Sequence, residues 1–260
     1  MGLAIVTGGA GAIGRACARA LVEDGWRVAL ADIDLAEAEA VAHGIGPGAV
    51  AAYRLDVTEF DAVHAVAGRI AADHGPVTGL VTAAGGGRNL DLTFGPFIET
   101  GPEEWDRNIE VHLNGVYHTC HAVLPLIIAA GGGAIVNTAS GAGIRGGPPH
   151  LRQRFASVYS ACKAGVIALT QAVAQEAGPL GVRANCIAPG RTETRAKPIE
   201  EMERLQGEEE ALRPGSGRAS PLGRFGRGAD MGNAAAFLMS DRAGYITGAC
   251  LDVTGGIRLH

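Results

Sequence analysis

The stretch Val6-Thr7-Gly8-Gly9-Ala10-Gly11-Ala12-Ile13-Gly14 determines the fold class that we predict for this chain. Three of its glycines have the spacing G-x-G-x-x-G. They follow an apolar run at Leu3–Thr7 and precede a helical pattern at Ile13–Glu23. Such a loop turns tightly, brings backbone N–H groups close to a pyrophosphate and sets a helix N-terminus opposite its negative charge. The motif alone is weak in a chain with 40 glycines among 260 residues, and a turn chosen only for tightness is the alternative. The flanking strand and helix favour a dinucleotide-binding loop.

Beyond this loop, short apolar runs rich in β-branched residues alternate with longer helical patterns. We expect strands at Leu3–Thr7, Arg27–Ala31, Val50–Leu55, Leu80–Thr82, Ala134–Thr138, Val182–Ile187 and Cys250–Val253. Helices are expected at Ile13–Glu23, Leu35–His43, Asp61–Asp73, Pro102–Ala130, Val158–Glu176 and Asp230–Met239. This alternation predicts an α/β, doubly wound Rossmann fold with a seven-stranded, mostly parallel sheet and helices on both faces. No linker or composition shift divides residues 1–260, so we expect one domain.

Composition narrows the classes of protein and partner. Apolar residues make up 47% and charged residues 19%, which excludes a disordered chain. The net charge of −5 makes nucleic acid and acidic membrane surfaces improbable partners. Five dispersed cysteines without a C-x-x-C pair indicate buried thiols in a reducing compartment, and we expect no metal site. The first strand begins too early for a signal peptide, and Ala122–Ala130 is too short to span a bilayer, so we expect a cytoplasmic protein without membrane partners.

Three irregular segments leave the carboxyl ends of expected strands, at residues 85–101, 140–157 and 190–228. Open α/β sheets bind ligands at this edge, so we expect these segments to form the substrate pocket. Eight arginines in or beside them are compatible with an anionic substrate, although solvated loop arginines are the alternative. They are Arg88, Arg145, Arg152, Arg154, Arg191, Arg195, Arg213 and Arg218.

The choice of dinucleotide depends on Asp32, which ends the second expected strand 18 residues beyond Gly14. A carboxylate there can accept hydrogen bonds from the adenosine ribose hydroxyls, and it repels a 2′-phosphate. No Arg or Lys adjoins Asp32 to bind such a phosphate, and Arg15 is the nearby cation. An exposed turn acid is the alternative. We predict that the cofactor is NAD.

Several further motifs occur in a fixed order along the chain. With them the sequence resembles the compact, single-domain branch of the short-chain dehydrogenase/reductase family over almost its whole length. The motifs are Thr7-Gly8…Gly14, Asp56-Val57, Ser140, Tyr159-x-x-x-Lys163, Pro189-Gly190-x-x-x-Thr194 and Tyr245-Ile246-Thr247-Gly248…Gly255-Gly256.

The candidate catalytic residues are Ser140, Tyr159, Lys163 and His112. Tyr159 and Lys163 lie four residues apart and so share one helix face. A phenol is a poor base at neutral pH, but a neighbouring ammonium and the positive nicotinamide of NAD⁺ favour the phenolate. Tyr159 would then act as acid and base on the substrate hydroxyl. The resemblance implies that Lys163 also holds the nicotinamide ribose and that Ser140 polarises the substrate oxygen. The alternatives are a helix-surface Tyr–Lys pair and a turn serine.

The resemblance also implies a set of cofactor contacts, in which Asp56 accepts from the adenine amine and the Pro189-Gly190 turn passes under the nicotinamide. The full predicted set is Gly8, Gly11, Ala12, Ile13, Gly14, Asp32, Ile33, Asp56, Val57, Ala83, Ala84, Gly85, Tyr159, Lys163, Pro189, Gly190, Thr192 and Thr194.

The chain departs from the family pattern at several positions. Ala12 stands where glycine is usual, and Thr82-Ala83-Ala84-Gly85 replaces Asn-Asn-Ala-Gly, so two amides that brace the central sheet are missing. The interval of 19 residues from Ser140 to Tyr159 is longer than usual, which indicates an enlarged pocket rim at 146–154.

His112 occupies the position of the family's catalytic asparagine, which supports a water that passes protons from Lys163 outward. If the backbone carbonyl holds that water, histidine can substitute. If the side chain holds it, an imidazole could take over the relay. A histidine packed in the helix with one satisfied nitrogen is the third reading.

We therefore predict an NAD(H)-dependent oxidoreductase that transfers a hydride between the nicotinamide and a secondary alcohol or ketone. A catalytically silent protein that senses dinucleotides on the same fold is the alternative, and an epimerase or dehydratase of the extended branch is disfavoured by the compact length. The family's oligomer faces correspond to Pro102–Ala130 and the tyrosine helix, and the last strand is apolar. We expect a homo-oligomer, either a dimer or a tetramer.

Overall fold

The computed structural model describes residues 2–46, 50–85, 97–145, 156–193, 200, 204 and 220–257. Its strands are β1 (Leu3–Thr7), β2 (Arg27–Asp32), β3 (Val50–Arg54), β4 (Val77–Thr82), β5 (Gly133–Thr138), β6 (Val182–Pro189) and β7 (Cys250–Val253). The α-helices are α1 (Ala12–Glu23), α2 (Leu35–Ile45), α3 (Phe60–His74), α4 (Pro102–Ile109), α5 (Gly115–Ala129), α6 (Gly141–Arg145), α7 (Ala156–Ala177) and α9 (Gly228–Met239). None of the helices in these described ranges is long and apolar enough to cross a membrane.

The strands form one parallel seven-stranded sheet, as the sequence predicts, and the structure gives their order as β3-β2-β1-β4-β5-β6-β7. The chain runs outward from β1 to β3 and then returns to continue from β4 to β7. The strand order therefore reverses between β1 and β4, which pair directly through partners such as Ile5 and Leu80. In open α/β sheets a crevice for ligands lies at the carboxyl ends of the strands at this switch point.

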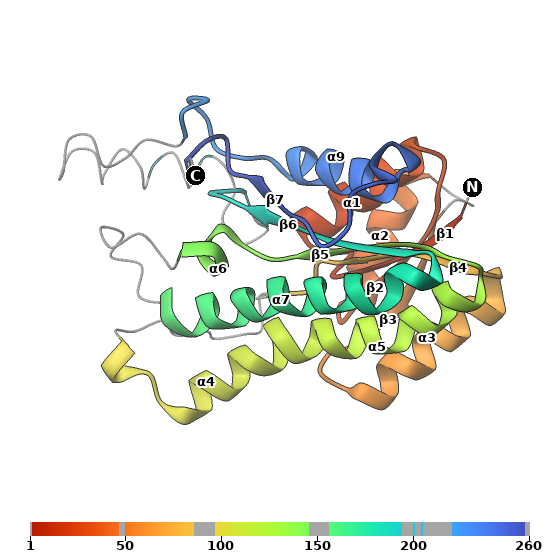
Figure 1. Cartoon of the computed structure of the whole chain (residues 1–260), viewed down its shortest axis with the longest axis horizontal. Helices are drawn as coiled ribbons and strands as arrows, with labels where there is room; N and C mark the ends of the chain where they lie inside the picture. The colour runs from red at the N-terminus through yellow and green to blue at the C-terminus, as the bar shows by residue number, and fades with distance from the viewer. Residues whose placement is uncertain are drawn as a thin grey trace.

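Helices cover both faces of the sheet, with α1 and α9 on one face and α3, α5 and α7 on the other (Figure 1). Successive strand residues point to opposite faces, so Ile5 packs under α3 and α5 while its neighbours Ala4 and Val6 pack under α1 and α9. All five residues of β1 are buried. Such a strand, apolar on both faces, is typical of a parallel sheet between two helical layers.

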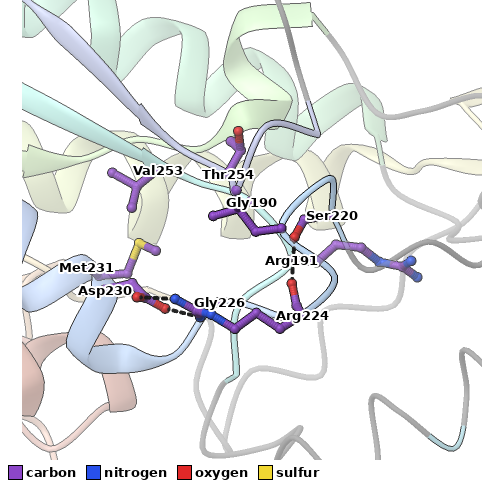
Figure 2. A pocket seen from close by; sticks show the side chains of 11 residues that line it. Gly190, Arg191, Ser220, Arg224, Gly226, Asp230, Met231, Val253 and Thr254 are labelled. Atoms are coloured by element: carbon purple, nitrogen blue, oxygen red, sulfur yellow. Dashed lines mark hydrogen bonds and ion pairs between the residues drawn. The ribbon is translucent and has the colours of Figure 1, made fainter.

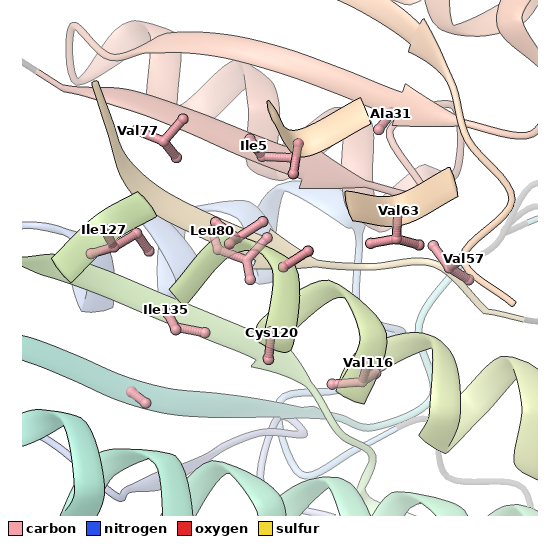
Figure 3. Packing of buried hydrophobic residues seen from close by; sticks show 14 of the residues in the cluster. Ile5, Ala31, Val57, Val63, Val77, Leu80, Val116, Cys120, Ile127 and Ile135 are labelled. Atoms are coloured by element: carbon pink, nitrogen blue, oxygen red, sulfur yellow. The ribbon is translucent and has the colours of Figure 1, made fainter. Parts of the chain in front are cut away.

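The larger core lies between the sheet and the layer of α3, α5 and α7. Figure 3 shows Leu80 and Ile135 of neighbouring strands beneath Cys120 and Ile127 of α5. Each of these four side chains is at most 3% exposed. Burying side chains of this size contributes roughly 1.5–3 kcal/mol each, so this layer holds α5 and α7 in fixed positions over the strand ends.

On the opposite face, α9 packs closely against α1 because glycines face the contact. A Cβ on Gly228 would lie 2.8 Å from the carbonyl oxygen of Ala12, and one on Gly232 would lie 2.5 Å from that of Ala16. The close approach places the start of α9 beside the start of α1. The beginning of α9 therefore lies near the glycine loop.

Several predicted boundaries are wrong. The fourth strand begins at Val77 and not at Leu80, because Thr78 and Gly79 hide the apolar pattern of a strand that is nevertheless nearly all buried. The helix predicted at Pro102–Ala130 is three pieces, with a π-helical turn at Glu110–Asn114 between α4 and α5. The segment 140–157 is not wholly irregular, since it begins with α6 and ends in the first turn of α7.

Candidate active site

The glycine loop joins β1 to α1, and two of its glycines are required by sterics. Gly8 has φ +67°, and an added Cβ would collide with the backbone of Ala83 and Ala84 beyond β4. A Cβ on Gly14 would collide with the carbonyl of Gly8. At Gly11 an added Cβ would meet only the Gly8 oxygen, at 3.2 Å, and would otherwise project into open space above the loop. The loop is thus closed beneath by its own backbone and open above.

Asp32 ties the glycine loop to the end of β2. One of its carboxylate oxygens accepts a hydrogen bond from the Ala10 N–H at 2.9 Å, and the other accepts from the Asp34 N–H at 3.0 Å. The next residue, Ile33, is a large apolar side chain that is 51% exposed. A carboxylate and an exposed apolar side chain therefore stand together at the carboxyl end of β2.

The predicted adenine contacts follow β3 in the same row of strand ends. Asp56 accepts hydrogen bonds from both the backbone N–H and the hydroxyl of Thr58 through one carboxylate oxygen. Val57 is buried against Gly115. A larger residue at position 115 would displace the Val57 side chain. The backbone carbonyl of Val57 also lies 3.0 Å from Nδ1 of His118.

The predicted catalytic residues Ser140, Tyr159 and Lys163 come together from β5 and α7. Lys163 is buried, and its ammonium donates a hydrogen bond of 2.8 Å to the carbonyl oxygen of Thr138, near the end of β5. The hydroxyl of Ser140, two residues further on, forms a hydrogen bond with the Tyr159 phenol. Close packing of α6 on α7 makes this possible, because Gly143 touches the backbone of Lys163.

The pKa values in this cluster differ from the sequence-based expectation. Burial raises the pKa of Tyr159, and the hydrogen bond from Ser140 counteracts this rise only in part. Burial also lowers the pKa of Lys163 to about 8. The Lys163 nitrogen lies over the Tyr159 ring, 5.8 Å from the ring centre. The sequence predicts a lowered Tyr159 pKa, whereas burial dominates in this arrangement and favours the neutral phenol.

His112 lies in the π-helical turn and faces the same cluster. Its ring is 3% exposed and meets the Tyr159 ring edge to face, with the ring centroids 5.0 Å apart. Gly85, just beyond β4, is its other neighbour, since a Cβ there would lie 3.6 Å from Cε1 of the imidazole. Neither ring nitrogen has a hydrogen-bond partner among the described residues. The reading of a packed histidine with one satisfied nitrogen is therefore not supported by these residues.

The charge state of His112 follows from its surroundings. Burial, together with the positive charge of Lys163, lowers the pKa of His112 to about 3. The imidazole is therefore neutral over the physiological pH range, with one N–H donor and one acceptor nitrogen. Two unpaired buried nitrogens beside Tyr159 are costly unless a substrate, a cofactor or a water satisfies them.

A cavity of about 110 Å³ lies on the other side of the strand ends, between β6, β7 and the start of α9 (Figure 2). Gly190 forms one wall, where a Cβ would lie 2.9 Å from the Cα of Thr254. Arg224 and Asp230 form a two-pronged ion pair at 2.7 and 2.8 Å beside it. Figure 2 shows the Arg191 side chain extending away from this pair. Its guanidinium lies 5.6 Å from the centre of the Phe225 ring.

The other predicted residues of this region are only partly described. Thr192 is buried and pairs with Gly226, which holds the segment after β6 against the segment before α9. Thr194 lies outside the described residues, as do the side chains of most of the predicted pocket arginines: Arg88, Arg145, Arg152, Arg154, Arg195, Arg213 and Arg218.

One structural residue near the site was missed from the sequence. Asn137, near the carboxyl end of β5, accepts a hydrogen bond from the Thr82 hydroxyl at 2.9 Å and donates to the Thr170 hydroxyl at 3.0 Å. It thereby connects β4, β5 and α7 inside the core. An asparagine within an otherwise apolar strand was the available signal, because a buried amide requires partners.

The chain is similar to known proteins over almost its whole length. Residues 8–258 match a family model described as Enoyl-(Acyl carrier protein) reductase. The chain is 33% identical to a 3-oxoacyl-[acyl-carrier-protein] reductase FabG of Thermotoga maritima over 256 residues, which is 97% of this chain and 96% of the relative. It is 37% identical to a sorbitol dehydrogenase of Cereibacter sphaeroides over 260 residues, with 97% and 96% covered. The crystal structure of gox2181 superposes with a TM-score of 0.86 at 31% identity, covering 98% of this chain and 95% of that one.

The chain belongs to the short-chain dehydrogenase/reductase family. The relatives named above are oxidoreductases, and the family uses a nicotinamide dinucleotide. The residues present fit such a cofactor, because Gly8 and Gly14 let the loop pack closely on its own backbone and Gly11 leaves the space above the loop open. The start of α1 directs backbone N–H groups to that space.

Proposed function

We propose that the protein is an NAD(H)-dependent oxidoreductase that interconverts a secondary alcohol and a ketone. The observation that carries this proposal is the cluster in which Ser140 bonds to the Tyr159 phenol while Lys163 is anchored on the carbonyl of Thr138. A silent dinucleotide sensor has no physical need for a hydroxyl, a phenol and a buried amine in one place. A catalyst of proton transfer at a substrate oxygen needs all three.

In this proposal each side chain has a separate task. Ser140 donates a hydrogen bond to the substrate oxygen and stabilises the negative charge that develops there. Tyr159 takes the hydroxyl proton during oxidation and returns it to the carbonyl oxygen during reduction. Lys163 holds the nicotinamide ribose and lies close enough to bias the charge of the phenol. A nicotinamide held by these residues would supply or accept the hydride, and its positive charge in the oxidised form would favour the phenolate that burial opposes.

We propose that His112 completes the proton path. Its neutral imidazole has an acceptor and a donor nitrogen, so it can hold a water and pass a proton without becoming charged at pH 7. Its position against Tyr159 and Gly85 is the position from which such a water could reach the buried amine. The backbone carbonyl of His112 could hold the same water, and substitution of the side chain separates the two possibilities.

The preference for NAD rests on Asp32, beside the exposed side chain of Ile33. Its carboxylate is held in place by two backbone N–H groups, so it cannot turn away from a 2′-phosphate without losing both bonds. The negative charge of the Asp32 carboxylate repels the 2′-phosphate and therefore disfavours the phosphorylated dinucleotide. The adenine ring would lie against the apolar surface of Ile33 and the row formed by Asp56 and Val57. Gly190 and Thr192 would line the nicotinamide end.

The substrate is proposed only as a class. The relatives named as a 3-oxoacyl reductase and a sorbitol dehydrogenase both act on an oxygen that is a ketone in one redox state and a secondary alcohol in the other. An anionic substrate remains a prediction from the arginines of the three loops. Inhibition of turnover by added phosphate supports it, and indifference to phosphate counts against it.

We also propose that the protein assembles with copies of itself. Apolar side chains stand exposed around the last strand, where Tyr245 is fully exposed and Leu251 and Ile257 are 37% and 38% exposed. Light scattering of the purified chain tests this, and a monomer at micromolar concentration would contradict it.

The first experiment follows the absorbance of reduced nicotinamide in a panel of polyols, secondary alcohols and 3-oxoacyl thioesters, with NAD(H) and NADP(H) in separate series. Turnover with NAD(H) that is lost in Tyr159→Phe and kept in Tyr245→Phe supports the proposal. Tight binding of NADH without turnover on any substrate favours the sensor. A strong preference for NADP(H) overturns the cofactor assignment and leaves the oxidoreductase intact.

A further inference from the structure

Two cysteines that the proposed chemistry does not use lie side by side at the edge of the sheet. Cys186 of β6 and Cys250 of β7 are direct partners in the register of the two parallel strands. Register partners on neighbouring strands have side chains on the same face, and both cysteines contact the core beneath α5 and α7. Neighbouring strands lie roughly 4.8 Å apart, and disulfides join Cα atoms about 4.4–6.8 Å apart. The pair is therefore within reach of a covalent bond.

The two thiols differ in accessibility. Cys186 is 1% exposed, whereas Cys250 is only half-buried. Cys250 begins the last strand of the sheet, and the described part of that strand pairs with β6 alone. An edge strand of four residues can shift by the fraction of an ångström that a disulfide requires, because only one row of backbone hydrogen bonds holds it.

The pKa values of the two thiols also differ, and the lower one belongs to the more accessible cysteine. A hydrogen bond with Cys186 lowers the pKa of the Cys250 thiol. The same bond, together with burial, raises the pKa of the Cys186 thiol. The more accessible sulfur, that of Cys250, therefore has the greater thiolate character.

None of the other three cysteines combines partial exposure with a lowered pKa. Cys17, Cys120 and Cys162 are at most 3% exposed. Cys120 donates to the amide oxygen of Asn137, and burial raises the pKa of Cys17 and of Cys120 to about 12. These three thiols are protected by burial, and Cys162 is a matched control because it lies beside Lys163 on the same face of the sheet.

We propose that Cys186 and Cys250 form a redox-sensitive pair that hydrogen peroxide converts to a disulfide between β6 and β7. The Cys250 thiolate attacks one peroxide oxygen, the O–O bond breaks, and Cys250 becomes a sulfenic acid while hydroxide leaves. The Cys186 sulfur then attacks the Cys250 sulfur, an S–S bond forms and the S–O bond breaks. The hydroxide from the first step takes up the proton that Cys250 lost, and the hydroxide from the second step takes up the proton of Cys186. In total two thiols and one peroxide give one disulfide and two waters.

The disulfide would change the fold locally at two points. It would fasten the edge strand, which leads into the wall of the cavity at Thr254, to the strand that leads into the turn at Gly190. It would also draw the Cys186 sulfur toward β7 and away from Lys163 and Thr170, with which it interacts in the reduced state. We expect slower amide exchange in β7 after oxidation.

The test treats the folded, reduced protein with a small excess of hydrogen peroxide, blocks remaining thiols by alkylation and digests without reduction. Mass spectrometry is expected to find a peptide pair that joins Cys186 to Cys250, lighter by two hydrogen atoms and separated again by dithiothreitol. Cys250→Ser and Cys186→Ser are expected to lose this product. Cys162→Ser is expected to keep it at the wild-type level.

Three outcomes would overturn the proposal. Both thiols could remain open to alkylation, Cys250 could proceed to a sulfinic acid while Cys186 stays reduced, or the bond could form between two chains, which non-reducing electrophoresis detects. The mapped bond in the wild-type chain decides the question even if a serine variant fails to fold. The readout needs no turnover, so it is independent of the proposed dehydrogenase activity.

Discussion

The ammonium of Lys163 donates a hydrogen bond of 2.8 Å to the backbone carbonyl of Thr138. This single bond fastens the helix that contains Tyr159 to the strand that leads to Ser140. A buried amine with a lowered pKa is paired with a neutral acceptor here, and no described carboxylate shares the bond. Because this pKa of about 8 is still above neutral pH, the amine is mostly protonated at pH 7, and the site holds a buried positive charge beside a neutral acceptor.

Removal of the Tyr159 hydroxyl tests the proposed acid and base. Tyr159→Phe keeps the ring that packs against His112 and loses the proton carrier, so we expect kcat to fall about 10²–10⁴-fold. Binding of NADH, measured by fluorescence, is expected to change little. Tyr245→Phe, at a fully exposed tyrosine, is the matched control and should retain wild-type turnover. Equal activity of the two variants would remove Tyr159 from the mechanism.

The lowered pKa of Lys163 predicts a pH dependence of stability. The folded pKa is about 8 and the ordinary value is 10.5, so between these values the unfolded chain binds a proton that the folded chain does not. Stability conferred through Lys163 therefore rises with pH across this window. From pH 8 to 10 we expect the free energy of unfolding of the wild-type protein to rise by about 2–3 kcal/mol relative to that of Lys163→Met.

Urea unfolding of the wild-type and Lys163→Met proteins at several pH values measures this difference. The comparison stops at pH 10 because the raised pKa of Tyr159 acts in the opposite direction above its ordinary value of 10.0. Parallel stability curves for the two proteins would show that the amine is solvated.

Asp32 is predicted to determine the choice between the two dinucleotides. Asp32→Ser removes the negative charge and retains a side-chain acceptor for the Ala10 N–H. We expect the ratio of kcat/KM for NAD over NADP to fall at least about tenfold, which corresponds to about 1.4 kcal/mol. Asp34→Ser, at the acid that caps α2, is the control and should leave the ratio unchanged. An unchanged ratio in Asp32→Ser would place the discrimination elsewhere.

Substitution of His112 separates a backbone role from a side-chain role. His112→Asn retains a donor and an acceptor, so we expect it to keep activity, whereas His112→Ala should lower kcat modestly. The pH profile of kcat should keep its shape in His112→Asn, since the imidazole does not titrate near neutrality in the wild-type protein. Complete inactivity of His112→Asn with intact cofactor binding would contradict the proposed relay.

Alanine substitutions at two glycines of the loop are predicted to have different effects. Gly8→Ala combines a positive φ with a backbone collision, so we expect a loss of about 1–3 kcal/mol of stability or a failure to fold. Gly11→Ala has a single contact at 3.2 Å and an open side, so it should fold nearly as well and lose affinity for NADH. Thermal denaturation and calorimetric titration measure the two effects. Equal destabilisation of both variants would mean that Gly11 is needed only for the turn.

Much of the fold followed from local patterns in the sequence. The alternation of short apolar runs with helical patterns predicts a parallel sheet between helices, because a strand buried on both faces must be apolar at every position. The spacing of Tyr159 and Lys163 predicts that they share a helix face, since four residues are close to one helical turn. The glycine loop was recognisable because the positive φ at Gly8 and the collision at Gly14 leave no other residue for those positions.

Other properties were decided only by the tertiary structure. The burial of His112 against Tyr159, the brace formed by Asn137 and the pairing of Cys186 with Cys250 all join residues far apart in the chain. The pKa directions of Tyr159 and Lys163 also depend on burial, which no local spacing reveals. Local sequence determines dihedral preference and amphipathic period. Desolvation and long-range hydrogen bonds determine the charge state of a site, and they exist only once the core has closed around it.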